Sequence, residues 1–468
     1  MADLAALTNR ASIIAELLAQ LTRDRKRVLV VTHIDADGLS SGSAAFHALT
    51  RARAIVSVRA IPDLDRRALE SLKSDHFDFY LFTDLGSGLI TELNAAFGES
   101  FAVVDHHQLP IEQAALPNVL NAWGFGCNGG TEACSSTMAY LLATTINVRN
   151  RDLAPLAIVG ALGDRQDSGD GRSLVGLNRI AVNDALETGL LEVTKDFLFH
   201  GRETRPIHEA VAMTYAPFIQ GLSGAKDSAL AALTSAGIAL KDRGRWRHLA
   251  ELSPEEKGKL MEVLTAYAGA SGTAGTAAVS ELVGEVYSFP SEDALTPLHD
   301  GREFATLLNA CGRMDATDVG IALCLGDRGT ALLESARLMS EYRSKLNKAI
   351  QALQTGDRVS THGSVTVVVG DDLVEERMTG SISSLFASSE KYKDKMVLVS
   401  TRSGEADLKF SSRLGDAFAK EVNLGLILKE AAESVGGVGG GHSMAAGAKI
   451  PAAKKAEFTA VVLEMVSR

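Results

Sequence analysis

Short apolar runs alternate with helical stretches over the first 165 residues, and this alternation restricts the fold more than any other feature. Strands that alternate with helices predict a parallel α/β sheet. The predicted strands are residues 28–32, 55–61, 77–83 and 101–104, and the predicted helices are residues 39–52, 63–73 and 89–97. Residues 158–163 form a further apolar segment, for which the pattern leaves strand and helix open.

The rest of the chain has a different pattern. Residues 185–300 are expected to be mostly helical, with breaks at 204–206 and around 269–275. A helical pattern from about residue 330 to 353 predicts a connecting helix. A second α/β module follows, and its clear strands are expected at residues 364–370 and 396–401.

Length and composition narrow the class of protein. The 468 residues exceed one compact core and predict two or three domains. No long uncharged apolar run and no signal peptide is present, so we expect no membrane span and a cytoplasmic location. The four cysteines form no C-x-x-C pair, which argues against a zinc knuckle or a redox motif. The net charge of −11 argues against binding nucleic acid through bulk charge, but not against a local basic groove.

Acidic and histidine residues follow four of the apolar segments directly. Ligands bind beyond the carboxyl ends of the strands in an open α/β sheet, so these residues are expected to converge on one site. Because residues two apart point the same way in an extended segment, residues 33, 35 and 37 are expected to face one pocket. The set consists of His33, Asp35, Asp37, Asp84, Asp105, His106, His107 and Asp164.

The residue types in this set indicate a metal site. Carboxylates and imidazoles without thiols suit Mn²⁺ or Mg²⁺. Six of the side chains are enough for two ions that share a carboxylate, and ions about 3.5–4 Å apart can promote displacement at phosphorus. The six are His33, Asp35, Asp37, Asp84, His106 and Asp164.

Single parts of the pattern also fit more ordinary roles. Asp84 alone fits a helix cap, and the triplet 105–107 alone fits a surface turn. An EF-hand is excluded, because the twelfth loop position counted from Asp35 is Phe46 rather than Glu. Since all four clusters follow apolar segments, we favour the metal site.

These motifs resemble those of the DHH superfamily, whose name describes the triplet Asp105-His106-His107. The glycine-rich residues 439–447 resemble the signature of a DHHA1 domain. Residues 121–130, 201–208, 302–315 and 320–327 resemble segments of archaeal RecJ-like single-strand exonucleases, including those that associate with the replicative GINS complex. The resemblance implies a parallel-sheet α/β DHH catalytic domain over residues 1–327, with residues 185–300 as a helical insertion. A connecting helix at 328–356 and a smaller α/β DHHA1 domain at 357–468 would follow.

The resemblance also implies roles for single residues. His33 and Asp35 would bind one metal ion, Asp37, His106 and Asp164 would bind the other, and Asp84 would bridge both. Asp105 would orient a neighbouring histidine, and His107 would contact the scissile phosphate. The implied substrate-binding residues are Asn309, Arg313, Ser412, Arg413, Gly440, Gly441 and His442. Consecutive glycines let a backbone approach a phosphate closely, and Arg413 would hold a backbone phosphate.

The expected function is a metal-dependent exonuclease that acts on single-stranded DNA or RNA in replication or repair, using two Mn²⁺ or Mg²⁺ ions. GINS or a repair helicase would be its protein partner. One alternative is a phosphodiesterase for oligoribonucleotides, cyclic dinucleotides or phosphoadenosine phosphate. Another is a replication or repair subunit with a mainly structural role.

Overall fold

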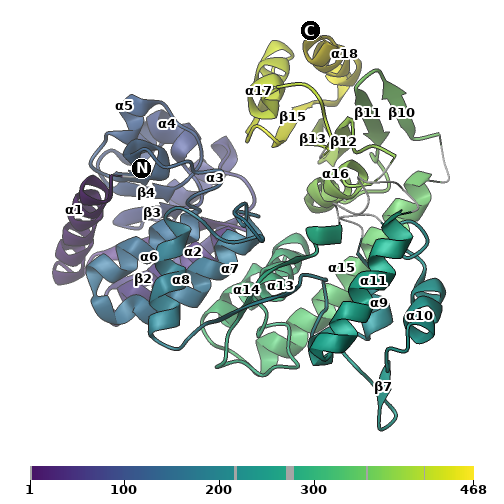
Figure 1. Ribbon diagram of the computed structural model, residues 1–468. Coiled ribbons are helices and arrows are strands. Elements are labelled where there is room, and N and C mark those ends of the chain that lie inside the picture. The colour runs from purple at the N-terminus through teal and green to yellow at the C-terminus, as the bar shows by residue number, and fades with distance from the viewer. Residues whose placement is uncertain are drawn as a thin grey trace. The chain divides into compact units, whose positions relative to one another are not determined.

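The computed structural model describes residues 3–214, 219–269, 279–354, 357–389, 391–415 and 417–467 (Figure 1). The chain divides into two compact units, and neither is one continuous stretch. Unit 1 holds residues 1–207, 241–253 and 280–339, and unit 2 holds residues 208–240, 254–279 and 340–468. The predicted limits placed residues 208–240 and 254–279 in the first domain instead, and those limits stay a prediction.

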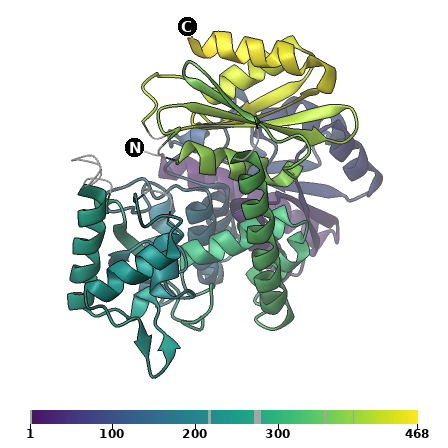
Figure 2. The same cartoon turned by 90° about the vertical axis from the view of Figure 1, so that its right-hand side faces the viewer.

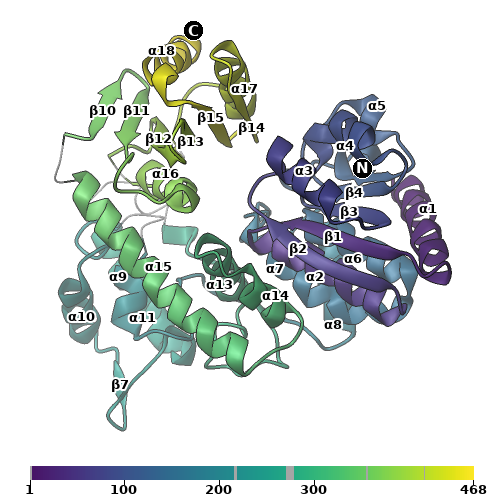
Figure 3. The same ribbon diagram turned by 180° about the vertical axis from the view of Figure 1, so that it is seen from behind.

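Unit 1 is built around a parallel sheet with the strand order β2-β1-β3-β4-β5 (Figure 3). The strands are β1 (Arg27–His33), β2 (Ile55–Ile61), β3 (Phe79–Thr83), β4 (Phe101–Asp105) and β5 (Val119–Asn121). All four predicted strands and the α/β fold are confirmed. The chain moves outward in one direction from β1 to β2 and in the other from β3 to β5. The gap between the ends of β1 and β3 is therefore the switch point at which open α/β sheets bind their ligands.

Helices cover both faces of this sheet, as the nearly continuous apolar character of its strands requires. Leu29, Val31, Tyr80 and Phe82 point to one face, where they share a buried cluster with residues of α3 and α4. Helix α2 packs against β1 and β2, and α6 packs against β3 and β4. The α-helices that lie within unit 1 are α1 (Leu4–Arg23), α2 (Ala36–Arg51), α3 (Arg66–Ser74), α4 (Ile90–Phe97), α5 (Ile111–Ala114), α6 (Ser135–Ile146), α7 (Ala154–Gly163), α8 (Asn178–Glu187), α13 (Gly301–Arg313) and α14 (Thr317–Cys324). Residues 158–163, left open between strand and helix, lie in α7.

The prediction of a mostly helical segment at 185–300 was only partly right. Helices α9 (Ile207–Ala212), α10 (Lys226–Ser235) and α11 (Pro254–Gly269) lie there. The prediction missed β6 (Glu192–Phe197) and β9 (Val283–Ser288), which pair antiparallel, and the short hairpin of β7 (Lys241–Asp242) and β8 (Arg245–Trp246). The break predicted at 204–206 lies in a turn, and that around 269–275 falls mainly outside the described residues.

A long helix, α15 (Thr330–Gln354), runs where the connecting helix was expected, although residues 355 and 356 of the predicted range lie outside the described residues. The C-terminal part of unit 2 is a sheet with the order β10-β11-β12-β13-β15-β14 (Figure 2). β11 and β12 pair parallel, and the other neighbours pair antiparallel. The strands are β10 (Val359–His362), β11 (Val365–Val369), β12 (Met396–Ser403), β13 (Asp407–Leu414), β14 (Val438–Gly441) and β15 (Ala445–Pro451).

Helix α16 (Thr379–Ala387) packs against β12 and β13. Helices α17 (Leu424–Ser434) and α18 (Lys455–Ser467) share a buried cluster with Leu408, Phe410 and Leu414 of β13. The second α/β module and the strands predicted in it are therefore confirmed, and its sheet is mixed. In the described part of the chain, no helix combines the length and the apolar character that crossing a membrane requires.

Candidate metal centre

The carboxyl ends of β1, β3 and β4 bring together side chains that are far apart in the sequence. His33 ends β1, Asp84 follows β3, and Asp105 ends β4. The Nδ1 atom of His33 lies 3.6 Å from Oδ2 of Asp84. The Nε2 atom of His106 lies 3.4 Å from Oδ1 of the same aspartate. The predicted convergence at one edge of the sheet is therefore present in the geometry.

The segment after β1 differs from the extended conformation that the sequence suggested. Asp35 is the N-cap of α2, and its Oδ1 accepts a hydrogen bond from the backbone N–H of Gly38 at 3.0 Å. Asp37 lies in the first turn of that helix, so the period-two argument for residues 33, 35 and 37 was wrong. The turn still places Oδ2 of Asp35 3.0 Å from Nδ1 of His33. Burial alone would lower the pKa of His33, but Asp35 and Asp84 raise it well above its usual value.

Asp37 is held by the N-terminus of α6, which the sequence analysis did not identify. The backbone N–H groups of Ser135 and Ser136 each donate to its carboxylate at 2.8 Å. Free N–H groups at a helix N-terminus favour a negative charge, so these bonds support a carboxylate there. Burial and the nearby Asp84 nevertheless raise the pKa of Asp37 to about 7. Burial disfavours the charged form of this carboxylate and is the largest cause of the rise.

Asp84 lies between the two histidines in a backbone conformation that is uncommon for residues other than glycine. Its φ is +58°, a left-handed conformation that Asp and Asn tolerate better than other side chains. The hydroxyl of Ser135 donates to Oδ1 of Asp84 at 3.0 Å. Burial opposes ionisation, but hydrogen bonds from His106 and His33 hold the pKa of Asp84 well below its usual value. A buried carboxylate that stays charged between two imidazoles suits a bridging ligand.

The orientation of His106 is set by the carbonyl oxygen of Gly129, which lies 2.6 Å from its Nδ1. Because a carbonyl can only accept, Nδ1 donates to it, and Nε2 is the ring nitrogen directed into the cluster. Nε2 faces Oδ1 of Asp84 and also Oδ2 of Asp37, at 3.8 Å. A backbone carbonyl on one ring nitrogen is a common way to fix the other nitrogen as a metal ligand.

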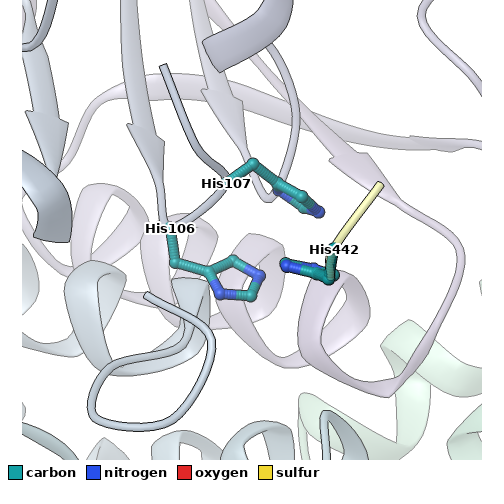
Figure 4. Close-up of side chains that lie close together, drawn as sticks. All are labelled: His106, His107 and His442. Atoms are coloured by element: carbon teal, nitrogen blue, oxygen red, sulfur yellow. The ribbon is translucent and has the colours of Figure 1, made fainter. Parts of the chain in front are cut away.

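Asp105 contacts the neighbouring histidine rather than the centre of the cluster. Its Oδ1 lies 2.8 Å from Nδ1 of His107 and accepts from the backbone N–H of His106 at 2.7 Å. Its other oxygen accepts from the backbone N–H of Ser87 at 3.1 Å. Although burial opposes it, His107 holds the pKa of Asp105 below its usual range. The rings of His106 and His107 lie side by side, 4.5 Å apart between centroids (Figure 4).

Asp164 lies at the C-cap of α7, with Oδ2 3.7 Å from Nδ1 of His106. Gln166, another residue that the sequence analysis missed, donates from Nε2 to Oδ2 of Asp164 at 2.7 Å. The same amide nitrogen donates to the carbonyl of Gly129 at 2.8 Å. Gln166 therefore links Asp164 to the carbonyl group that orients His106. Burial raises the pKa of Asp164. No signal in a single sequence distinguishes Gln166 from a surface glutamine.

Asn309 and Arg313 lie on α13, and Asn309 contacts the first motif directly. Oδ1 of Asn309 accepts a hydrogen bond from the backbone N–H of Ala36 at 3.1 Å, between Asp35 and Asp37. Gly312 of the same helix packs directly against the backbone of this loop, because a Cβ atom there would be 1.8 Å from the carbonyl oxygen of Ile34. Asn309 thus holds the loop after β1, while Arg313 is half-buried at the end of the same helix.

The residues of this edge fit a divalent cation. The donor atoms of His33, Asp35 and Asp84 lie within 4.8 Å of one another, as do those of Asp84, Asp105, His106 and His107. They are carboxylate oxygens and imidazole nitrogens, the donors that Mn²⁺ and Mg²⁺ accept. Burial and neighbouring carboxylates raise the pKa values of Asp37 and Asp164, and added positive charge at this edge would lower them. A bound cation would supply that charge.

In unit 2, the predicted substrate-binding pair of β13 points to opposite faces of the sheet. Ser412 is fully buried, and its hydroxyl donates to the carbonyl of Val397 at 3.0 Å, so its side chain is used within the sheet. Arg413 is half-buried on the other face, which Ser411 shares. The hydroxyl of Ser411 lies 3.0 Å from that of Ser383 on α16.

The glycines of the C-terminal signature form β14 and the turn after it. Gly440 pairs with Gly447 of β15, and Gly441 pairs with Ala446. Gly441 has a φ of +138°, and a Cβ atom there would lie 2.6 Å from the carbonyl oxygen of Ala445. His442 begins the turn, and its half-buried position leaves part of its surface accessible. The turn therefore requires the glycine at position 441.

Two family models match this chain. Residues 362–468 match the DHHA1 domain, and residues 199–283 match the DHH-CID domain. These matches agree with the acidic edge of the parallel sheet. Both matched regions are domains of the DHH superfamily. This superfamily consists of metal-dependent phosphoesterases, and the chain has its RecJ-like fold.

Known proteins resemble this DHH protein over nearly its whole length. An uncharacterized protein of Methanocaldococcus jannaschii is 27% identical over 457 residues, which cover 94% of this chain and 93% of that protein. RecJ from Thermus thermophilus, solved in complex with Mn²⁺, has a TM-score of 0.59 at 17% identity over 98% of this chain. This chain spans only 55% of that RecJ. Cdc45 from Entamoeba histolytica has a TM-score of 0.65 at 11% identity, over 98% of this chain and 99% of that chain.

Proposed function

We propose that this DHH protein is a metal-dependent exonuclease that hydrolyses phosphodiester bonds of single-stranded DNA or RNA. The observation that carries the proposal is the placement of Asp84, between His33 and His106 at the β1/β3 switch point. Two imidazoles and a buried, ionised carboxylate at that position would form the core of a site for two cations. The fold that this chain shares with RecJ, which was solved with Mn²⁺, supports the same reading.

The proposed ligands fall into two groups around that carboxylate. His33 and Asp35 would hold one ion, Asp37, His106 and Asp164 would hold the other, and Asp84 would contact both. Bound divalent ions lower the pKa of water and stabilise both the attacking and the leaving oxygen at phosphorus. The chain would keep the ligands in position through Ser135, Gln166 and Asn309, which hold Asp84, Asp164 and the loop after β1.

His107 would bind the scissile phosphate. Its Nδ1 contacts Asp105, and a phosphate would be bound through the other ring nitrogen, Nε2. Burial would lower the pKa of His107, but the Asp105 carboxylate raises it above the ordinary value, which favours the cationic form. A cationic imidazole can donate a charge-assisted hydrogen bond to a phosphate oxygen. Asp105 therefore orients His107 and stabilises its charge.

The DHHA1 domain would hold the rest of the strand. Arg413 and Ser411 share one face of β13, where β15 presents only the small residues Ala445 and Gly447 opposite them. Small residues let a phosphate approach the backbone, and an arginine can bind its oxygens in pairs. The predicted substrate contacts of Gly440, Gly441 and His442 belong to this proposal. Ser411 takes the place of Ser412, whose side chain is fully buried on the opposite face of the strand.

The proposal is tested by digesting single-stranded DNA and RNA 20-mers, labelled at either end in turn, with and without Mn²⁺. Mn²⁺-dependent release of mononucleotides from one end is the expected result. Intact 20-mers together with hydrolysis of dinucleotides would instead assign a phosphodiesterase for small substrates. No hydrolysis of either substrate would refute the proposal.

A second candidate function is that of a subunit in a replication or repair assembly. The similarity to Cdc45 over nearly the full length of both chains supports it. GINS or a repair helicase is the proposed partner. Co-purification of such a protein with the tagged chain, at a fixed ratio through gel filtration, would support this role. A chain that elutes alone from extract would count against it.

A further inference from the structure

A hollow of about 390 Å³ lies beside the catalytic triplet in unit 1, and the proposed mechanism does not use it. Its walls are the segment Gln108–Ile111 and the side chain of Trp123. The first wall begins directly after His107 in the chain. Ile111 is 65% exposed, which is unusual for so large an apolar side chain beside a charged site.

Hydrogen bonds fix the second wall to the same triplet. The indole Nε1 of Trp123 donates to the carbonyl oxygen of His106 at 2.9 Å. The side-chain amide of Asn121 donates to the carbonyl of His107 at 2.9 Å, and its oxygen accepts from the backbone N–H of Trp123 at 3.0 Å. The hollow therefore keeps a fixed position relative to the two histidines.

The chemistry of the walls differs sharply from that of the adjoining cluster. None of the five lining residues carries a charge, and an indole, a proline ring and two branched aliphatic side chains provide most of the surface. A nucleotide has the same division, with a charged phosphate and an uncharged planar base. Aromatic side chains bind bases of any sequence by stacking, because every base has a π face.

We propose that this hollow is a nucleobase subsite, in which the base next to the scissile phosphate packs between Trp123 and the 108–111 segment. The inference rests on the proposed function and adds to it the part of the substrate that the chain recognises. The subsite would bind purine and pyrimidine bases alike, because its walls offer apolar contact and no charge. Bound there, the base would position the phosphate at His107.

The test is a double-mutant cycle in which one change removes the protein side chain and the other removes the substrate base. Single-stranded 12-mers carry one abasic nucleotide, moved stepwise from the end at which cleavage starts. With the wild type, the abasic nucleotide should lower kcat/KM about ten-fold at one position only, the value of one stacked base. Trp123→Ala should lower kcat/KM for the intact 12-mer by the same factor. In this variant, an abasic nucleotide at the sensitive position should lower kcat/KM no further. Trp123→Phe is the matched control, because it loses the indole N–H as alanine does but keeps an aromatic face.

A binding measurement separates failure of the subsite from failure of the proposed function. The chain contains two tryptophans, and Trp246→Phe leaves Trp123 as the single indole fluorophore. Titration of this variant with a dodecamer in the absence of metal should quench its fluorescence, and an abasic 12-mer should quench it less. Loss of all cleavage with this difference intact would refute the exonuclease but keep the subsite. Equal quenching by both oligonucleotides, or independent penalties in the cycle, would overturn the subsite.

Discussion

Replacement of Gln166 by methionine tests whether the residues around the cluster set its affinity for metal. Gln166 is fully buried, and methionine has a similar volume, so the change removes hydrogen bonds without opening a cavity. The Nε2 bond to Asp164 at 2.7 Å and the bond to the Gly129 carbonyl at 2.8 Å are both lost. Oε1 also stops accepting from Nδ2 of Asn178, at 2.8 Å.

The magnitude follows from the charge of Asp164. A hydrogen bond to a charged group contributes about 1.5–3 kcal/mol. If that bond holds Asp164 in a ligand position, its loss should weaken Mn²⁺ binding about 10–100-fold, the range found for such supporting residues. Leaving the buried amide of Asn178 without its acceptor should also lower the free energy of unfolding by about 1–3 kcal/mol.

Isothermal titration of the purified protein with Mn²⁺ measures the affinity, and urea unfolding without metal measures the stability. Gln20→Met is the control, because it makes the same substitution at an exposed position of α1. The control should bind Mn²⁺ like the wild type. Wild-type affinity in Gln166→Met, with or without a loss of stability, would refute the assignment of Asp164 as a supported ligand.

Three further predictions concern separate parts of the molecule. Asp84→Asn should abolish Mn²⁺-dependent hydrolysis while circular dichroism stays unchanged, since asparagine tolerates the φ of +58°; retained hydrolysis would contradict a bridging role. Arg413→Ala should raise KM for a 20-mer more than it lowers kcat, whereas a loss confined to kcat would contradict its role in binding. Burial and Asp300 raise the pKa of Glu303 to about 7, so its contribution to stability is full below about pH 4.5 and is lost as the pH rises through 7. The free energy of unfolding should therefore fall as the pH rises, and Glu303→Gln should reduce this fall by up to about 3 kcal/mol. Urea unfolding from about pH 5 to 8 measures the fall. The same dependence on pH in the variant would show that Glu303 does not cause it.

The sheet of unit 1 could be predicted because central parallel strands are buried on both faces. Such strands appear in a sequence as continuous apolar runs, which is how Val28 to Val31 and Phe101 to Val104 stand out. The residues that follow those runs were found for the same reason. The strand β6 was missed because it reads EVTKDF, with few apolar residues and most of its side chains not buried.

The supporting residues of the site could not be predicted in this way. Ser135 and Ser136 hold Asp37 with backbone N–H groups, which every residue type except proline carries. The orientation of His106 depends on a carbonyl oxygen 23 positions away, and that contact exists only in the folded chain. The orientation of Ser412, in contrast, was available. Ser412 is spaced by two residues from Phe410 and Leu414, and residues at that spacing share one face of a strand. The period-two pattern therefore already placed it on the buried face.

The interleaved course of the chain has a consequence for how the protein is made. Unit 1 is not complete until residue 339 has been synthesised, although its sheet is finished at Asn121. A nascent chain that stops before α13 would present the acidic edge without Asn309 against the loop after β1. Domains generally fold in the order of their synthesis, but here neither unit can finish before residues of the other have left the ribosome. Fragments cut at any one position would therefore each carry an incomplete unit.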